Sequence, residues 1–321
     1  MNNIEWGDKL RAKVIDKLKN RRGIRLPHNN NIAFGGDEKC LEVTLHESAL
    51  RASNMQNNDS AFEAWILAII SWCDVQKVNI HHELSREKVY KKEGHYQRAL
   101  YRLERFSELM QGKVRIDKII FSDSKTRTSA HPTINVALGK DTSSNTSSAG
   151  SESEIEKDFT RNGTPRRLLM EKFDLQELDR QFPVGLFDGE PAKGREIFTG
   201  GKSAIDLIGI DRNKDIWIFE LKKPGNVAIG AISELLFYSE MLKDAQGTHP
   251  LFQFSQRLPG SRIKVSPENI RDAKQIHARL LLEDTHPLLS DDVFALLNSA
   301  AKSAGWAIDY GRVQLADYWP S

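Results

Sequence analysis

Two apolar segments separated by a short polar turn place the strongest constraint on the fold of this chain. Residues 203–211 and 215–222 are rich in Ile, Leu, Phe and Trp, and Arg212, Asn213 and Lys214 lie between them. This pattern predicts a β-hairpin with a three-residue loop. Because both faces of the two segments are largely apolar, we expect central strands that are covered by helices on each side.

Three ionisable residues interrupt the apolar pattern of this hairpin. With the turn centred on Asn213, Asp206 falls opposite Glu220, and Lys222 shares a face with Glu220 because side chains alternate along a strand. Two facing carboxylates stay ionised when a hard divalent cation lies between them, so we expect Asp206 and Glu220 to hold Mg²⁺, or Mn²⁺ in its place. Such an ion polarises a phosphate and activates a water, and Lys222 would orient that water or stabilise the developing charge. A Glu-x-Lys taken alone is also compatible with an ordinary ion pair at a sheet edge.

The run from about residue 200 to residue 242 resembles the core of the PD-(D/E)XK nuclease superfamily, the restriction-endonuclease-like fold. In that superfamily a first acidic residue, a (D/E)-x-K tripeptide and a following helix carry the site. These features match Asp206, the tripeptide from Glu220 to Lys222, and a predicted helix over residues 227–244. The residue before Asp206 is Ile205 rather than the Pro of the motif, which leaves the required carboxylate in place.

The resemblance also implies supporting residues. RecB-like members carry Gln-x-x-x-Tyr on the helix after the hairpin, and this chain has Glu234 in place of the Gln and keeps Tyr238. Many members place a further acidic ligand on the helix before the hairpin. Residues 153–162 open like a capped helix, with Ser153 followed three residues later by Glu156, so Glu156 is a candidate metal ligand or support. The alternative for Glu156 is a solvated acidic helix start that is favoured by the macrodipole.

The rest of the C-terminal half completes the expected fold class, which is α/β. Residues 275–283 and 306–315 read as strands and residues 291–303 as a helix, so this tail would complete a mixed β-sheet flanked by helices, a restriction-endonuclease-like core. Lys202 follows two glycines beside the candidate site and is expected to contact a phosphate, although the spacing of a P-loop is absent.

The composition predicts two domains joined by a linker. Residues 122–152 are crowded with Ser and Thr, as in a flexible linker, and they separate an α-rich (α+β) domain over 1–121 from the nuclease-like domain over 153–321. Residues 1–130 hold 23 Lys and Arg against 17 Asp and Glu, so polyanion attraction is expected in the N-terminal part. The chain shows no apolar run of membrane-spanning length and no signal peptide, and we expect it to be cytoplasmic.

A second group of candidate residues lies on a predicted helix over residues 95–111. Arg98, Arg102 and Arg105 share one face of that helix, opposite its apolar stripe. Like charges at this spacing repel unless an anion offsets them, so these residues are candidates for binding nucleic acid. A plain solvated face is the alternative.

The function expected from the sequence is Mg²⁺-dependent hydrolysis of phosphodiester bonds in nucleic acid, with DNA favoured as the partner and an endonuclease favoured over an exonuclease. The resemblance implies a setting in restriction, phage defence or repair, and a homodimer is a further expectation. Two alternatives stay open at this point. One is a nuclease fold that binds nucleic acid without cleaving it, and the other is an N-terminal domain that binds a protein partner.

Overall fold

The computed structural model describes residues 1–18, 24–82, 94–116, 132–134, 151–198, 203–255 and 264–319. Contacts between these residues divide the chain into two compact units. Unit one comprises the described residues of Met1–Ser124, Val227–Glu234 and Thr285–Trp306, and unit two comprises those of Lys125–Asn226, Leu235–Asp284 and Ala307–Ser321. This grouping differs from the contiguous domains expected from the sequence, because two later segments belong to the N-terminal unit. Neither unit has, in its described part, a helix long and apolar enough to cross a membrane.

Unit one is built on a four-stranded sheet with the order β1-β2-β3-β4. Strands β1 and β2 are antiparallel, whereas β2 with β3 and β3 with β4 are parallel. The elements of this unit are α1 (Asn3–Leu18), β1 (Ile32–Gly36), β2 (Cys40–Leu45), α2 (Glu47–Leu50), α3 (Phe62–Cys73), β3 (Lys77–His82), α4 (Gly94–Leu109), β4 (Val114–Ile116) and α9 (Asp291–Ser303).

Helix α3 forms the centre of unit one. It is apolar on nearly all sides, and almost every one of its residues is buried, including Cys73 at its C-terminal end. Helices α1 and α9 both pack against it. The indole Nε1 of Trp72 donates to the carbonyl of Leu288 at 3.0 Å, which ties the segment before α9 to α3. A buried helix that is apolar all round needs neighbours on several sides, and a distant segment of the chain supplies one of them.

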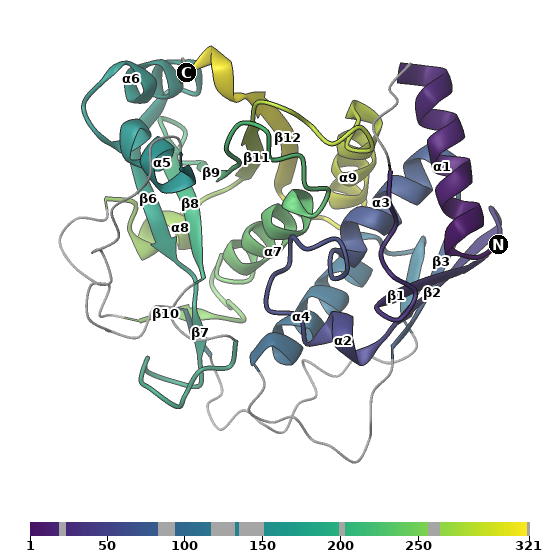
Figure 1. Ribbon diagram of the computed structural model, residues 1–321. Helices are drawn as coiled ribbons and strands as arrows, with labels where there is room; N and C mark the ends of the chain where they lie inside the picture. The colour runs from purple at the N-terminus through teal and green to yellow at the C-terminus, as the bar shows by residue number, and fades with distance from the viewer. Residues whose placement is uncertain are drawn as a thin grey trace. The chain divides into compact units, whose positions relative to one another are not determined.

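Unit two is built on a five-stranded mixed sheet with the order β12-β11-β9-β8-β6 (Figure 1). Strands β6, β8 and β9 are antiparallel neighbours, whereas β11 lies parallel to both β9 and β12. The elements of this unit are β5 (Thr133–Ile134), α5 (Glu152–Thr160), α6 (Thr164–Lys172), β6 (Leu175–Pro183), β7 (Leu186–Phe187), β8 (Ala204–Asp211), β9 (Ile216–Leu221), most of α7 (Ala231–Lys243), β10 (Gln253–Phe254), α8 (Pro267–Asp272), β11 (Ile276–Leu282), β12 (Ile308–Gln314) and the short 3-10 helix η1 (Leu315–Asp317).

Helices cover both faces of this sheet. On one face, α5 and α6 lie beside β6, and side chains such as Phe159 and Leu169 join Leu207 and Phe219 in one core cluster (Figure 1). On the other face, the Ser239 hydroxyl of α7 lies 3.2 Å from the hydroxyl of Tyr310 on β12. The structure therefore confirms an α/β fold with the predicted hairpin in the interior of a mixed sheet.

The predicted linker lies mainly outside the described residues. Within residues 122–152, the structure describes 132–134 and 151–152. Thr133 and Ile134 are buried and form β5, the middle strand of a three-stranded sheet with β10 and β7. These two residues are thus part of a sheet and not of a flexible linker.

Two helix starts differ from the sequence expectation. Helix α7 begins at Ala231 and not at residue 227. Gly230, just before it, lies against the backbone of Gln56, where an added Cβ would approach the carbonyl oxygen to 2.3 Å. Helix α5 begins at Glu152, and its N-cap is Ser151, whose side chain accepts the backbone N–H of Glu154. The predicted cap at Ser153 is therefore wrong, and Glu156 lies two residues beyond Glu154, which occupies the N3 position.

Candidate functional site

The β8–β9 hairpin carries both predicted acidic residues at its open end. The ladder between the two strands ends with Leu207 opposite Phe219, so Asp206 and Glu220 are the next residues beyond the paired positions, and their direct opposition stays a prediction. Directly opposed residues of an antiparallel pair point to the same face of the sheet. Asp206 is half-buried, and its Oδ2 accepts the backbone N–H of Leu221 at 2.9 Å. This bond fixes one carboxylate oxygen of Asp206 against the end of β9.

Glu220 and Lys222 form a buried ion pair at the same end of the hairpin. The Nζ of Lys222 lies 2.5 Å from Oε1 of Glu220, and the side chains are only 2 % and 3 % exposed, respectively. Two charges so close together offset part of each other's desolvation penalty. The ammonium group is thereby held next to the carboxylate pair, where the sequence expected it.

Glu156 of α5 joins this cluster, which makes it the strongest supporting residue among those predicted. It is 4 % exposed, so the alternative of a solvated acidic helix start is wrong. Burial and the nearby charge of Asp206 raise the pKa of Glu156 to about 7, although a hydrogen bond from Gln181 opposes that rise. Two carboxyl groups that repel each other in a buried place are typical of a site that receives a cation.

Gln181 connects the two carboxylates. Its Nε2 donates to Oε2 of Glu156 at 2.8 Å and to Oδ1 of Asp206 at 3.5 Å. Gln181 lies on β6, where the pairs of Arg180 with Leu207 and Phe182 with Ile205 place it across from Asp206. Its backbone φ is 52°, a left-handed value that costs a non-glycine residue on the order of 1 kcal/mol.

A second acidic residue of α5 anchors the helix to the site. Oε1 of Glu152 accepts the backbone N–H of Lys223 at 3.2 Å and the side-chain amide of Asn226 at 3.3 Å. These bonds join the first turn of α5 to the segment just after β9. The position of Glu156 relative to the hairpin is therefore held by hydrogen bonds as well as by the apolar core.

The helix after the hairpin contributes differently from the expectation. Glu234 accepts a hydrogen bond from the side chain of Gln56, and both residues belong to unit one. Tyr238 is buried in unit two, and its ring lies 5.4 Å from that of Phe237. A supporting role for Glu234 and Tyr238 in catalysis stays a prediction.

The expectation of a solvent-facing arginine stripe on the predicted helix 95–111 is wrong. The helix is α4, and Arg98, Arg102 and Arg105 are 5 %, 3 % and 8 % exposed. Arg102 forms a two-pronged ion pair with Glu63 of α3, through Nε at 2.8 Å and Nη2 at 2.5 Å.

The other two arginines are also engaged within unit one. Arg98 donates to the backbone carbonyls of Ala52 and Ser53, and Arg105 bonds to Glu104 and Glu108. The three guanidinium groups are buried and bond to other residues of unit one. The reason for assigning phosphate contacts to these arginines therefore no longer holds. Lys202, the remaining candidate for phosphate contact, lies outside the described residues.

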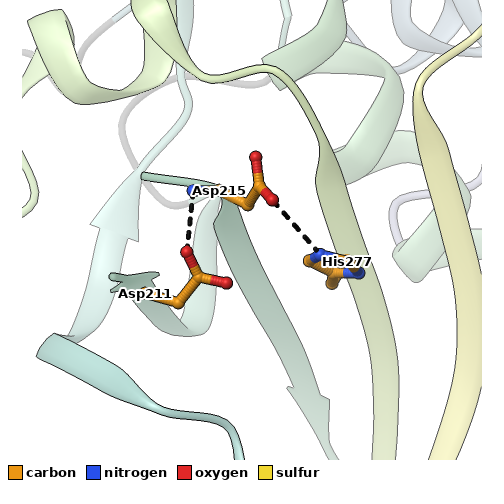
Figure 2. A group of neighbouring side chains, drawn as sticks. All are labelled: Asp211, Asp215 and His277. Atoms are coloured by element: carbon orange, nitrogen blue, oxygen red, sulfur yellow. Dashed lines mark hydrogen bonds and ion pairs between the residues drawn. The ribbon is translucent and has the colours of Figure 1, made fainter. Parts of the chain in front are cut away.

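Another group of possible metal ligands lies at the turn end of the hairpin, away from Asp206 (Figure 2). Asp211, Asp215 and His277 bring one ligand atom each to within 4.8 Å of the others. The Asp211 carboxylate accepts the backbone N–H groups of Asn213 and Asp215, at 2.8 and 2.9 Å, and the indole N–H of Trp217 at 3.1 Å. This carboxylate closes the turn of the hairpin, which explains its place without an ion.

His277 is engaged in the same network. Its Nδ1 lies 3.1 Å from Oδ2 of Asp309, and its ring stacks on Trp217 with centroids 4.1 Å apart. Among the described residues, Asp211, Asp215 and His277 form the one group of three whose ligand atoms all lie within 4.8 Å of one another, and Asp206, Glu220 and Glu156 do not form such a group.

Sequence reasoning missed Gln181 and Glu152. Neither residue belongs to the motif that led to the hairpin, and a glutamine on a strand carries no distinctive spacing. The one available signal was the acidic start of α5, which predicted the helix but not the direction of each carboxylate. Comparison of the chain with protein-family models, with curated proteins and with solved structures finds no match in any of the three.

Proposed function

We propose that this chain is a divalent-cation-dependent nuclease that hydrolyses phosphodiester bonds in nucleic acid, with DNA as the favoured substrate. The observation that carries the proposal is a set of contacts at the open end of the hairpin. Asp206 accepts the backbone N–H of Leu221, which lies between Glu220 and Lys222 in the sequence, and Gln181 bonds to both Asp206 and Glu156. Carboxylates that lie close together can bind a metal ion, and the ammonium group of Lys222 beside them suits a phosphate.

The order of elements in unit two supports the same proposal. The elements α5, β6, β8, β9, α7 and β11 occur in this order along the chain, with α6, β7, β10 and α8 between some of them. Strands β6, β8 and β9 are antiparallel neighbours, and β11 is parallel to β9. This is the arrangement that we expect of a restriction-endonuclease-like core. The setting that the resemblance implies is restriction, phage defence or repair.

The donor set fits a hard divalent cation such as Mg²⁺. Asp206 and Glu220 would hold the ion and Glu156 would complete the set, since all three offer carboxylate oxygens. When bound, the cation polarises the scissile phosphate and makes an attacking water more acidic. Lys222 supplies a fixed positive charge that stabilises negative charge on the phosphate as the bond breaks.

Cleavage assays test this proposal. The purified chain should cut plasmid or linear DNA with Mg²⁺ or Mn²⁺ and lose activity in EDTA. Single-stranded DNA and RNA in the same assay define the substrate class.

Variants of the site residues test the assignment directly. Asp206→Asn and Glu220→Gln should each abolish cleavage, whereas Asp215→Asn, which removes a carboxylate at the other end of the hairpin, should cut normally. Full activity of either site variant, or activity in EDTA, would overturn the assignment. Binding without cleavage by the parent chain would favour an inactive nuclease fold.

A further inference from the structure

Gln181 occupies an unusual position for a residue with no packing role. It is exposed, so it contributes little to the core, yet its backbone adopts a left-handed conformation within β6, two residues before the strand ends at Pro183. Residues other than Gly, Asn and Asp rarely take this conformation. The surrounding structure must therefore hold it there, and such positions cluster at functional sites.

The conformation of Gln181 aims its amide at two carboxylates. The Nε2 group has two hydrogens, and the acceptors are Oε2 of Glu156 and Oδ1 of Asp206. Because both partners are carboxyl groups, the nitrogen side of the amide is the side that suits them. One of the partners comes from a helix and the other from a strand, so the amide joins two separate elements of unit two.

Asp206 is held on both oxygens as a result. Leu221 donates to its Oδ2, and Gln181 donates to its Oδ1. A carboxylate held in this way cannot rotate freely, and a ligand set that is already oriented loses less entropy on binding a cation.

We propose that Gln181 is a positioning residue that holds Glu156 and Asp206 together and thereby preorganises the cation site. This inference rests on the proposed function, because it assigns a cation to these carboxylates. Gln181 acts through its two partners and needs no contact with the substrate.

The test compares the cation affinity of matched variants of the full chain. Isothermal titration with Mn²⁺ should show weaker binding for Gln181→Gly, by roughly 10- to 100-fold, as is usual when a residue that orients metal ligands is lost. Gln181→Asn accepts the left-handed backbone but is one methylene shorter, so it should show a similar loss. Gln176→Ala removes another exposed glutamine of β6 and should bind Mn²⁺ like the parent. Each titration is repeated in an Asp206→Asn background, in which the Gln181 effect should disappear.

A purely structural role predicts a different pattern. Glycine favours a positive φ, so Gln181→Gly should unfold at the same temperature as the parent or at a higher one, while its cation affinity falls. At saturating Mn²⁺, the rate of cleavage should recover toward that of the parent. Unchanged Mn²⁺ affinity of Gln181→Gly in a chain that cleaves DNA would overturn the inference and leave the nuclease proposal standing. Weakened affinity in a chain that cleaves nothing would support the inference and count against the nuclease proposal.

Discussion

The two units differ in how they accommodate buried charge. In unit one, Arg102 and Glu63 lie in a two-pronged ion pair, and the guanidinium group also donates to the carbonyl of Ser60. The same group stacks over the ring of Phe62, at 4.7 Å from its centroid. Opposite charges and hydrogen bonds thus satisfy each other within the fold.

Unit two also contains a buried pair of opposite charges, Glu220 and Lys222, but in addition it brings two like charges close together. The charge of Asp206 adds to the effect of burial in raising the pKa of Glu156, and Gln181 bridges the two carboxyl groups. Folding alone accounts for buried opposite charges, because each partner offsets the charge of the other. Like charges held close together oppose folding and are more frequent at functional sites, so the carboxyl groups of unit two are better candidates for binding a ligand than the arginines of unit one.

The largest effect is expected from breaking the matched pair in unit one. Arg102→Met leaves the Glu63 carboxylate buried without its partner, which should lower the free energy of unfolding by about 3–5 kcal/mol. Urea unfolding measures this loss. The double variant Arg102→Met/Glu63→Gln should recover much of the stability, because no uncompensated charge is then buried. DNA affinity of the folded double variant should match the parent, and a clear loss of affinity would return Arg102 to the nucleic-acid surface.

The next largest effect is expected from Lys222 of unit two, whose ammonium group carries a fixed positive charge. Lys222→Met should lower kcat by roughly 10²- to 10³-fold, because a fixed positive charge that acts on the transition state is lost. Single-turnover cleavage at saturating Mn²⁺ measures this change, and thermal unfolding in the same buffer verifies the fold. Lys223→Met is the matched control, since Lys223 is exposed and adjacent. Normal cleavage by Lys222→Met together with loss in Lys223→Met would move the active position by one residue.

A third prediction concerns the opposed carboxylates directly. The pKa of Glu156 is raised to about 7 in the folded chain, so the folded state holds this proton more tightly than the unfolded state. The stability that this contributes is fully present below the unfolded pKa and is lost as the pH rises through about 7. In EDTA at pH 8, Glu156→Gln should therefore be more stable than the parent by about 3 kcal/mol.

Urea unfolding at pH 8 and at pH 5 checks this prediction. The difference in unfolding free energy between Glu156→Gln and the parent should be much smaller at pH 5, where the carboxyl group of the parent is protonated in the folded state. Adding Mn²⁺ at pH 8 should also reduce the difference, because a cation stabilises the ionised form. Equal stabilities at pH 8 in EDTA would mean that the pKa of Glu156 is not raised in the folded chain.

The smallest effect concerns the helix that delivers Glu156. Ser151→Ala removes the side chain that caps α5 and should cost about 1 kcal/mol of unfolding free energy. Ser153→Ala, at the position first expected to be the cap, is exposed and should change stability by less than about 0.5 kcal/mol. The reverse order of effects would restore the sequence-predicted helix start and shift Glu156 toward the surface.

Much of unit two could be predicted from the sequence because its information is local. The hairpin is specified by apolar strands around a polar turn, so the register that pairs Leu207 with Phe219 followed from counting residues outward from Asn213. The helix over residues 291–303 and the strand near 276–282 were also found, because their periodicity needs no partner to be recognised.

Long-range pairing explains what could not be predicted. The periodicity of α4 places its arginines on one face, but the carboxylate that receives Arg102 lies on α3, 39 residues earlier. A charged face looks the same in a sequence whether water or a buried partner covers it. The same reason hid Gln181, whose two acceptors lie 25 residues away on either side of it.

Local patterns in the sequence are sufficient to predict the α/β class, the hairpin, and the order of an acidic residue, a Glu-x-Lys tripeptide and a helix. These features depend on alternation and helical periodicity, which are properties of neighbouring residues. The folded chain was needed to find that the arginines of α4 are interior, that α9 packs in unit one, and that Gln181 bonds to both Glu156 and Asp206. Burial and charge pairing depend on segments far apart in the chain, so they become defined only when the chain has folded.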